Sequence, residues 1–234
     1  MTLGPMGEAL SRKLKQVFSP QSLDVIDESL LHAGHAGAHP QGESHFRIDI
    51  VAEVFAGKSR IERHRMVNEA LAAELRSRVH ALAIRAKAPE DGLSLAPIAA
   101  NDERLVSLLR HNSLPVDDLG GEAKKFFALV TATGEVAAVA GIELGGSDAM
   151  MRSVAVADAY RSKGLGRAIV RNLLADLRRK GVNAVYILTQ SAEKFFAGLG
   201  FSKVERSMVP KAVTETSQFT GTRCSSASAM MLKL

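Results

Sequence analysis

The short run at residues 161–167 is the part of this sequence whose residue types and spacing point most directly to chemistry. It reads Arg-Ser-Lys-Gly-Leu-Gly-Arg, and it lies between an apolar stretch at 154–156 and a long amphipathic segment. Glycines such as Gly164 and Gly166 let backbone N–H groups close on phosphate oxygens, and the N-terminus of a following helix adds a favourable dipole. The run therefore predicts a pyrophosphate-binding loop, and with it a phosphorylated cofactor.

The apolar pattern around this loop predicts alternating strands and helices. A dinucleotide-binding fold would need a third glycine in a loop after the first strand, and an acidic residue about twenty positions further on. Here Arg161 opens the loop, no third glycine follows, and several strands precede it, so we do not expect a dinucleotide site. The predicted strands are 93–98, 126–131, 136–143, 149–156, 184–188 and one from Phe201, and the predicted helices are 101–111, 164–180 and 192–199.

The histidines separate the first part of the chain from the rest, because six of the seven lie before residue 81. The stretch Ala88-Pro89-Glu90-Asp91-Gly92 has nothing to bury and predicts the joint, with domains at 1–88 and 93–234 and a linker at 89–92. In the first domain the pattern predicts a helix at 7–17, strands at 23–27 and 45–51, a helix at 60–75 capped by Ser59, and a strand at 81–86.

Composition limits the class of protein. An apolar fraction of 46% supports real cores, and the net charge of +5 is spread over both halves, unlike that of a dedicated nucleic-acid binder. The single cysteine excludes an internal disulfide framework and suits a reducing compartment. No apolar run approaches the ~20 residues needed to cross a bilayer. We therefore expect a cytoplasmic protein without a membrane segment.

The first half resembles the BolA family, through five motifs in the same order: Asp27-Glu28-Ser29, Glu43-Ser44-His45-Phe46-Arg47, Phe55-Ala56-Gly57-Lys58, Arg63-His64-Arg65-Met66-Val67-Asn68 and Val79-His80-Ala81-Leu82. The resemblance implies a small α/β domain related to KH domains, in the order αββαβ. It also implies a monothiol glutaredoxin as partner, and a histidine that completes a shared [2Fe–2S] cluster.

By its position in the BolA-like motif, the cluster histidine is His80. The second ligand is expected from the histidine-rich loop at 31–44, where His35 is our choice and His32 and His45 remain alternatives. Imidazole nitrogen can replace thiolate on cluster iron. Because this half contains no cysteine, a partner would have to supply the sulfur ligands.

The second half resembles the GNAT N-acetyltransferases. The residues that carry the resemblance are Val154-Ala155-Val156, the Arg-x-x-Gly-x-Gly run of 161–166, and Ala192-Glu193-Lys194-Phe195-Phe196-Ala197-Gly198-Leu199-Gly200-Phe201. The segments 111–115, 186–189 and 219–231 look more narrowly like the arsenic-resistance-associated acetyltransferases of this superfamily. The resemblance implies a mixed sheet, acetyl-CoA as donor and a small amine, which can be amino-acid-like, as acceptor.

The resemblance also assigns roles around the loop. The edge of the strand from Val154 to Val156 would pair with the pantetheine arm, and a backbone N–H near Val156 would polarise the thioester carbonyl. Amide groups between Arg161 and Gly166 would bind the pyrophosphate, with Lys163, Arg167 or Arg171 meeting its charge. The expected binding run is Arg161, Ser162, Lys163, Gly164, Leu165, Gly166 and Arg167.

The acid and the base are less determined by the motifs. Related enzymes commonly use a tyrosine in the later motif to protonate the leaving thiolate, but this chain has Phe195 and Phe196 there. Glu143, at the end of a predicted strand, is our candidate base for the acceptor ammonium, and a surface carboxylate is the alternative interpretation. Cys224 stands beside Ser225 and Ser226 with no visible partner that could take its proton, so we do not expect it to act as a nucleophile.

Three functions are thus in view. The leading hypothesis is an acetyl-CoA-dependent N-acetyltransferase fused to a module that docks a glutaredoxin or iron–sulfur partner. The second is a redox adaptor whose GNAT-like half only binds acetyl-CoA. The third is a transcriptional regulator that reads DNA through the basic stretch at 60–65, which the nearly neutral charge of the first half disfavours.

Overall fold

The computed structural model describes residues 3–32, 42–76, 79–220 and 226–234. The chain forms two compact units, one of residues 1–91 and 162–164 and the other of residues 92–161 and 165–234. Each unit has its own sheet and its own hydrophobic core. The predicted ligand His35 and the lone Cys224 lie outside the described residues.

The first unit has the predicted αββαβ order, with a three-stranded sheet in the order β1-β2-β3. Strand β2 pairs with β1 in the antiparallel sense and with β3 in the parallel sense. The elements are α1 (Pro5–Phe18), β1 (Ser22–Asp27), η1 (Ser29–His32), β2 (His45–Val51), η2 (Glu53–Phe55), α2 (Arg60–Ala70), α3 (Ala72–Leu75) and β3 (Ala81–Lys87), where η marks a 3₁₀ turn.

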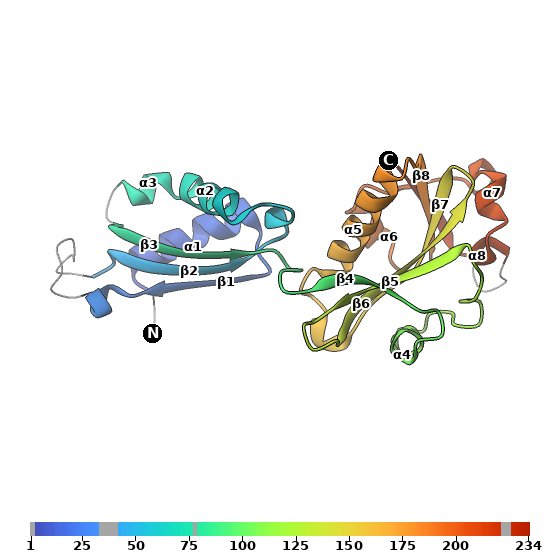
Figure 1. Ribbon diagram of the computed structural model, residues 1–234. Helices are drawn as coiled ribbons and strands as arrows, with labels where there is room; N and C mark the ends of the chain where they lie inside the picture. The colour runs from blue at the N-terminus through green and yellow to red at the C-terminus, as the bar shows by residue number, and fades with distance from the viewer. Residues whose placement is uncertain (1–2, 33–41, 77–78, 221–225) are drawn as a thin grey trace. The chain divides into compact units, whose positions relative to one another are not determined.

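The core of this unit lies between the sheet and helices α1 and α2, which cover the same face (Figure 1). Phe46, Ile48 and Ile50 point into it from alternate positions of β2, as the period of two predicts. Ser59 caps α2 through a reciprocal bond with Glu62, in which each side chain accepts from the other residue's backbone N–H.

The predicted helix at 60–75 is wrong in one respect, because the chain breaks it into α2 and α3. Leu71 leaves the helical region with φ −102° and ψ 13°, and its side chain is fully buried in the core. The apolar spacing continues across the break, and therefore the sequence pattern does not reveal it.

The second unit contains a mixed seven-stranded sheet in the order β4-β5-β6-β7-β8-β10-β9, which confirms the predicted fold class. Its elements are β4 (Ser94–Ile98), α4 (Glu103–His111), β5 (Lys124–Val130), β6 (Val136–Gly145), β7 (Asp148–Val156), η3 (Asp158–Tyr160), α5 (Leu165–Arg179), β8 (Ala184–Thr189), α6 (Glu193–Ala197), β9 (Ser202–Lys203), η4 (Arg206–Met208), α7 (Lys211–Thr214), α8 (Ser217–Thr220) and β10 (Ser228–Lys233).

Helices cover both faces of this sheet (Figure 1). The long helix α5 packs on one face, where Ile169 and Leu173 are buried against β6 and β7. Helices α4 and α7 pack on the other face, through residues such as Leu105 and Val213. The middle of this sheet is therefore covered by helices on both faces.

Three elements at the end of the chain, α7, α8 and β10, were not predicted from the sequence. The two helices have four residues each, too few for a helical period to stand out. Strand β10 inserts between β8 and β9 and pairs antiparallel with both. Only the tertiary structure decides that insertion.

Candidate active site

Strands β7 and β8 diverge in the middle of the second sheet. Their parallel pairing is confined to Ala149 with Val185 and Met150 with Tyr186, although both strands continue beyond these pairs. The backbone edge of β7 from Ser153 to Val156 is thus left without the neighbouring strand on that side. A strand edge of this kind can accept an extended ligand by adding its hydrogen bonds to the sheet.

A β-bulge in β7 accompanies the divergence. The register with β6 shifts between Val139 and Gly141, so that Ser153 and Val154 together oppose Ala140. Ser153 has a positive φ of 55°, which residues other than glycine rarely adopt. Bulges redirect the strand and its backbone groups, and this one does so at the strand segment predicted to meet the cofactor.

The predicted phosphate loop lies directly after β7 and η3. Ser162 and Gly164 both have positive φ, of 60° and 75°, and helix α5 begins at the next residue, Leu165. The first four N–H groups of a helix have no acceptor inside it. A Cβ on Gly166 would stand 3.4 Å from the side chains of Val156 and Phe195. These features fit the predicted cradle for a phosphate group.

One part of the predicted cradle is occupied by the protein itself. The backbone N–H of Arg161 donates to the carbonyl oxygen of Asp158 at 3.2 Å, and the Arg161 guanidinium donates to the side chains of Asn112 and Asp158. The loop's capacity for phosphate therefore rests on the residues after Arg161.

A cavity of about 650 Å³ opens between the diverging strands. Its walls come from the end of β7, the end of β8 and the segment after α4. The residues around it are Asn112, Ser113, Leu114, Pro115, Arg152, Ser153, Val154, Ile187, Leu188, Thr189, Gln190, Ser191, Ala192, Phe196, Gln218 and Ala227. A mostly neutral, polar and apolar lining next to an open strand edge can hold a small organic acceptor.

At this wall, Arg152, whose side chain is fully buried, forms an ionic network. Its guanidinium makes two parallel bonds to the Asp118 carboxylate, at 2.8 and 2.6 Å, and a third bond of 3.0 Å to the hydroxyl of Ser217. The Glu143 carboxylate lies 3.8 Å from the same guanidinium. A buried arginine needs such partners because an unpaired charge away from water is costly.

The sequence contained a signal for this network that we did not use. Arg152 interrupts an otherwise apolar strand, and a charge at such a position implies a buried partner. What the sequence does not give is the identity of that partner, since Asp118 and Ser217 lie 34 and 65 positions away.

The network makes a prediction for acid stability. The Arg152 guanidinium holds the pKa of Asp118 well below its usual range. A depressed folded-state pKa stabilises the fold above the unfolded pKa, about 3.9, and this stabilisation is lost as the pH falls further. We expect the free energy of unfolding to decline below about pH 4. In Asp118→Asn, the part of this decline that comes from the Asp118 carboxyl should be absent, and urea unfolding at neutral and at acid pH measures it. The same pH dependence in the variant and in the wild-type protein would contradict the prediction.

The predicted base Glu143 is hydrogen-bonded to another residue of the protein. Its side chain is buried and accepts hydrogen bonds from the backbone N–H of Ser217 at 3.3 Å and from the Ser217 hydroxyl at 3.2 Å. Glu143 is not among the residues around the cavity. By contrast Phe196, one of the two phenylalanines in the later motif, does border the cavity and packs edge-on against Phe195.

The structure brings two histidines of the first unit together. The rings of His45 and His80 lie 5.5 Å apart between centroids, because His45 pairs with Ala81 in the parallel register of β2 and β3. His80 is exposed, whereas His45 is largely buried and its Nδ1 lies 3.0 Å from the Ser44 hydroxyl. The described residues hold no group of three or more metal-ligating side chains, so this pair would need further ligands from elsewhere.

The basic stretch at the start of α2 is partly used inside the first unit. Arg63 forms a two-bond ion pair with Asp91 and also donates to the carbonyl oxygens of Lys58 and Ala86. Its side chain is only 13% exposed, which removes it from the set of cations that could meet a phosphate backbone.

Two family models match the chain. The model described as "BolA-like protein" matches residues 14–91, and the model described as "Acetyltransferase (GNAT) family" matches residues 94–201. Together they cover most of both units and meet near the change from one to the other.

Curated relatives resemble part of the chain. An uncharacterized protein in the cobS 5' region of a Sinorhizobium species is 47% identical over 83 residues, which make up 35% of this chain and 89% of the relative. BolA-like protein 1 of Mus musculus is 48% identical over 86 residues, 37% of this chain, but the chain spans only 60% of that protein's length.

Among solved structures, Rv2747 from Mycobacterium tuberculosis in complex with CoA and NLQ aligns with 60% of this chain and 99% of its own, with 21% identity and a TM-score of 0.49. In the part of the chain that the structure describes, no helix combines the length and apolarity needed to cross a membrane.

Proposed function

Because the chain belongs to the BolA family in its first domain and carries a GNAT-family acetyltransferase domain in its second, we propose that it transfers an acetyl group from acetyl-CoA to a small amine, and that its first domain docks an iron–sulfur partner. The observation that supports the transferase most is that β7 and β8 diverge, which leaves a free edge of β7 beside a cavity, and that the phosphate loop follows β7 along the chain.

In this proposal acetyl-CoA is a substrate held by the second domain. The N–H groups after Arg161, at the start of α5, would bind its pyrophosphate, and Lys163, Arg167 or Arg171 would meet the charge. The free edge from Val154 to Val156 would pair with the pantetheine arm. A backbone N–H near Val156 would then hold the oxygen on which charge develops, a contribution of about 3 kcal/mol in comparable sites.

The reaction is a direct acyl transfer in the cavity. The lone pair of the amine nitrogen forms the new bond to the thioester carbon, the carbon–sulfur bond breaks, and its electron pair leaves with the thiolate. The proton lost by nitrogen balances the proton that the thiolate takes up. Holding both substrates between β7 and β8 supplies the proximity on which such a reaction depends.

The general base stays a prediction. The Glu143 carboxylate accepts hydrogen bonds from Ser217 and lies 3.8 Å from the Arg152 guanidinium. Because Glu143 stands behind the cavity wall, a proton would reach it through Ser217 or a water molecule. With Phe195 and Phe196 in place of a tyrosine, the thiolate would take its proton from solvent.

A donor-binding and turnover assay tests the transferase. We expect acetyl-CoA to raise the melting temperature, and we expect free CoA to appear when the protein is mixed with a panel of amines, amino acids and arsenical amino-acid analogues. The arsenicals belong in the panel because of the resemblance at 111–115 and 186–189. Donor binding without turnover on any acceptor would favour the adaptor hypothesis instead.

For the first domain, we propose that His80 ligates a [2Fe–2S] cluster whose thiolates come from a partner such as a monothiol glutaredoxin. Two imidazoles can replace two thiolates on one iron and raise its reduction potential. Of the alternatives for the second ligand, His45 is the one whose ring the structure places 5.5 Å from that of His80. A network of Ser29 and Ser44 supports the backbone at His45.

The cluster proposal predicts spectra that depend on His80 and on one further histidine. His80→Ala should change the visible absorption of a cluster assembled with monothiol glutaredoxin, because one nitrogen ligand is lost. If His45 is the second ligand, His45→Ala should do the same, whereas His35→Ala should leave the spectrum as it is. His64→Ala, in helix α2, is the matched control. Spectra that do not respond to His80→Ala would remove it as a ligand.

A further inference from the structure

The cavity wall at residues 112–115 is built onto the end of helix α4. The backbone N–H of Ser113 donates to Arg110 and that of Leu114 donates to Leu109, which closes the helix end. Ser113 has a positive φ of 55°, as residues that end helices in this way often do. The wall and the end of α4 therefore form one structural piece.

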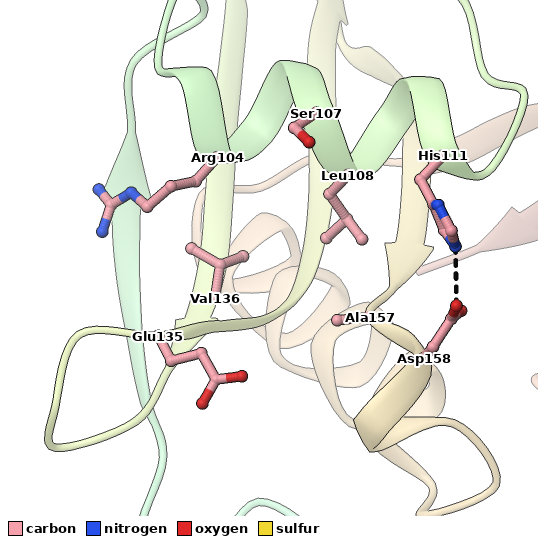
Figure 2. Close-up of a pocket in the computed structure, with 8 residues that line it drawn as sticks. All are labelled: Arg104, Ser107, Leu108, His111, Glu135, Val136, Ala157 and Asp158. Carbon is pink, nitrogen blue, oxygen red and sulfur yellow. Dashed lines mark hydrogen bonds and ion pairs between the residues drawn. The ribbon is translucent and has the colours of Figure 1, made fainter.

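A ring of four side chains joins this piece to the start of the phosphate loop. His111 Nε2 lies 2.7 Å from one oxygen of the Asp158 carboxylate, and the other oxygen lies 3.0 Å from Arg161 Nη2. Arg161 Nη2 also donates to the side-chain oxygen of Asn112 at 2.9 Å. Figure 2 shows the His111–Asp158 contact between α4 and η3, at one end of a second cavity of about 400 Å³.

On both sides of the ring, hydrogen bonds to backbone carbonyl oxygens hold its residues in place. The Asn112 amide nitrogen donates to the carbonyl oxygen of Leu108, so its oxygen is directed at Arg161. On the other side, the Arg161 N–H bonds to the Asp158 carbonyl oxygen. Contacts at two points, His111 with Asp158 and Asn112 with Arg161, hold the orientation of the two pieces as well as their distance.

We infer that Asn112 and Asp158 are positioning residues, which fix the cavity wall at residues 112–115 to the phosphate loop. Acetyl-CoA bound at the loop therefore also orders the wall. The inference rests on the proposed function, because it takes acetyl-CoA as the ligand of the loop. Arg161 is the last residue before the phosphate-binding segment, and it bonds a residue of the cavity wall directly. Restricting the loop therefore restricts the wall.

The expected effect of a bound donor on hydrogen exchange in the cavity wall is moderate. His111 and Asp158 are 60% and 56% exposed, and single ion pairs of that exposure contribute little. The coupling comes from the closed ring, in which a ligand that removes motion from one side removes it from the other. We expect a change of about three- to tenfold in local exchange rates, which corresponds to about 0.7–1.4 kcal/mol.

Hydrogen exchange of the peptide covering residues 108–116, with and without CoA, tests the inference. CoA should slow exchange there by about threefold or more in the wild-type protein. Asn112→Ala and the conservative Asp158→Asn should still bind CoA but lose this slowing. Asp102→Asn is the matched control, since Asp102 pairs with Arg104 at the opposite end of α4 and asparagine keeps the helix cap.

The outcomes separate the two proposals. Failure of wild-type protein to bind CoA would overturn the proposed function, and with it the basis of this inference. CoA binding without slower exchange at 108–116 would overturn the inference alone. So would an Asn112→Ala protein in which exchange is faster by the same factor with and without CoA, because that pattern reports a structural role only.

Discussion

Gly164→Glu is expected to abolish the stabilisation of this protein by acetyl-CoA. The substitution acts twice, because Gly164 has a φ of 75° that side chains rarely adopt and because the new carboxylate would face the pyrophosphate. Two like charges about 4 Å apart repel by about 1–4 kcal/mol between water and a protein surface. The affinity for acetyl-CoA should therefore fall by up to about a thousandfold, measured by calorimetry and by the thermal shift.

Gly181→Glu is the matched control for this prediction. Gly181 has nearly the same φ of 76°, nothing lies within 4 Å of its missing Cβ, and it follows the opposite end of the same helix. The control therefore carries a comparable backbone cost without a charge at the phosphate loop, and without the 2.8 Å approach to the Gln21 side chain that a Cβ at Gly164 would make. Both variants should lose some stability, but only Gly164→Glu should lose the response to acetyl-CoA. Equal responses in the two variants would show that the donor binds elsewhere.

Arg152→Met should lower the free energy of unfolding by about 3–5 kcal/mol, the usual cost of removing one partner from a buried ion pair. The side chain of Arg152 is fully buried, and its loss leaves Asp118 and Glu143 facing each other across Ser217. Methionine keeps much of the volume, so the effect reports the charge more than a cavity. Urea unfolding at neutral pH measures it.

Two comparisons make that prediction specific. Arg104→Met removes an arginine that is 56% exposed from the ion pair with Asp102, and it should cost far less stability than Arg152→Met. Adding Asp118→Asn to Arg152→Met should recover part of the lost stability, because it removes one of the uncompensated charges. A double variant that is less stable than Arg152→Met would argue that Asp118 has another stabilising partner.

Much of the local structure could be predicted from residue order alone. Strand β2 was predicted with the bounds that the structure gives, because Phe46, Ile48 and Ile50 alternate with polar residues. The Ser59 cap was also predicted, because a serine directly before the first helical residue is a typical N-cap, and the structure adds Glu62 as its reciprocal partner. The fold class of both domains was likewise recognisable from motifs in sequence order.

Residue order alone determined most of the elements and the turn that precedes α5, because periodicity, caps and glycine conformations depend on neighbours within a few positions. Tertiary structure alone decided which distant groups meet. The parallel register of β2 and β3 places His45 beside His80, and strand packing brings Asp118 and Ser217 to Arg152. Those encounters depend on how whole elements pack, and spacing along the chain carries no record of them.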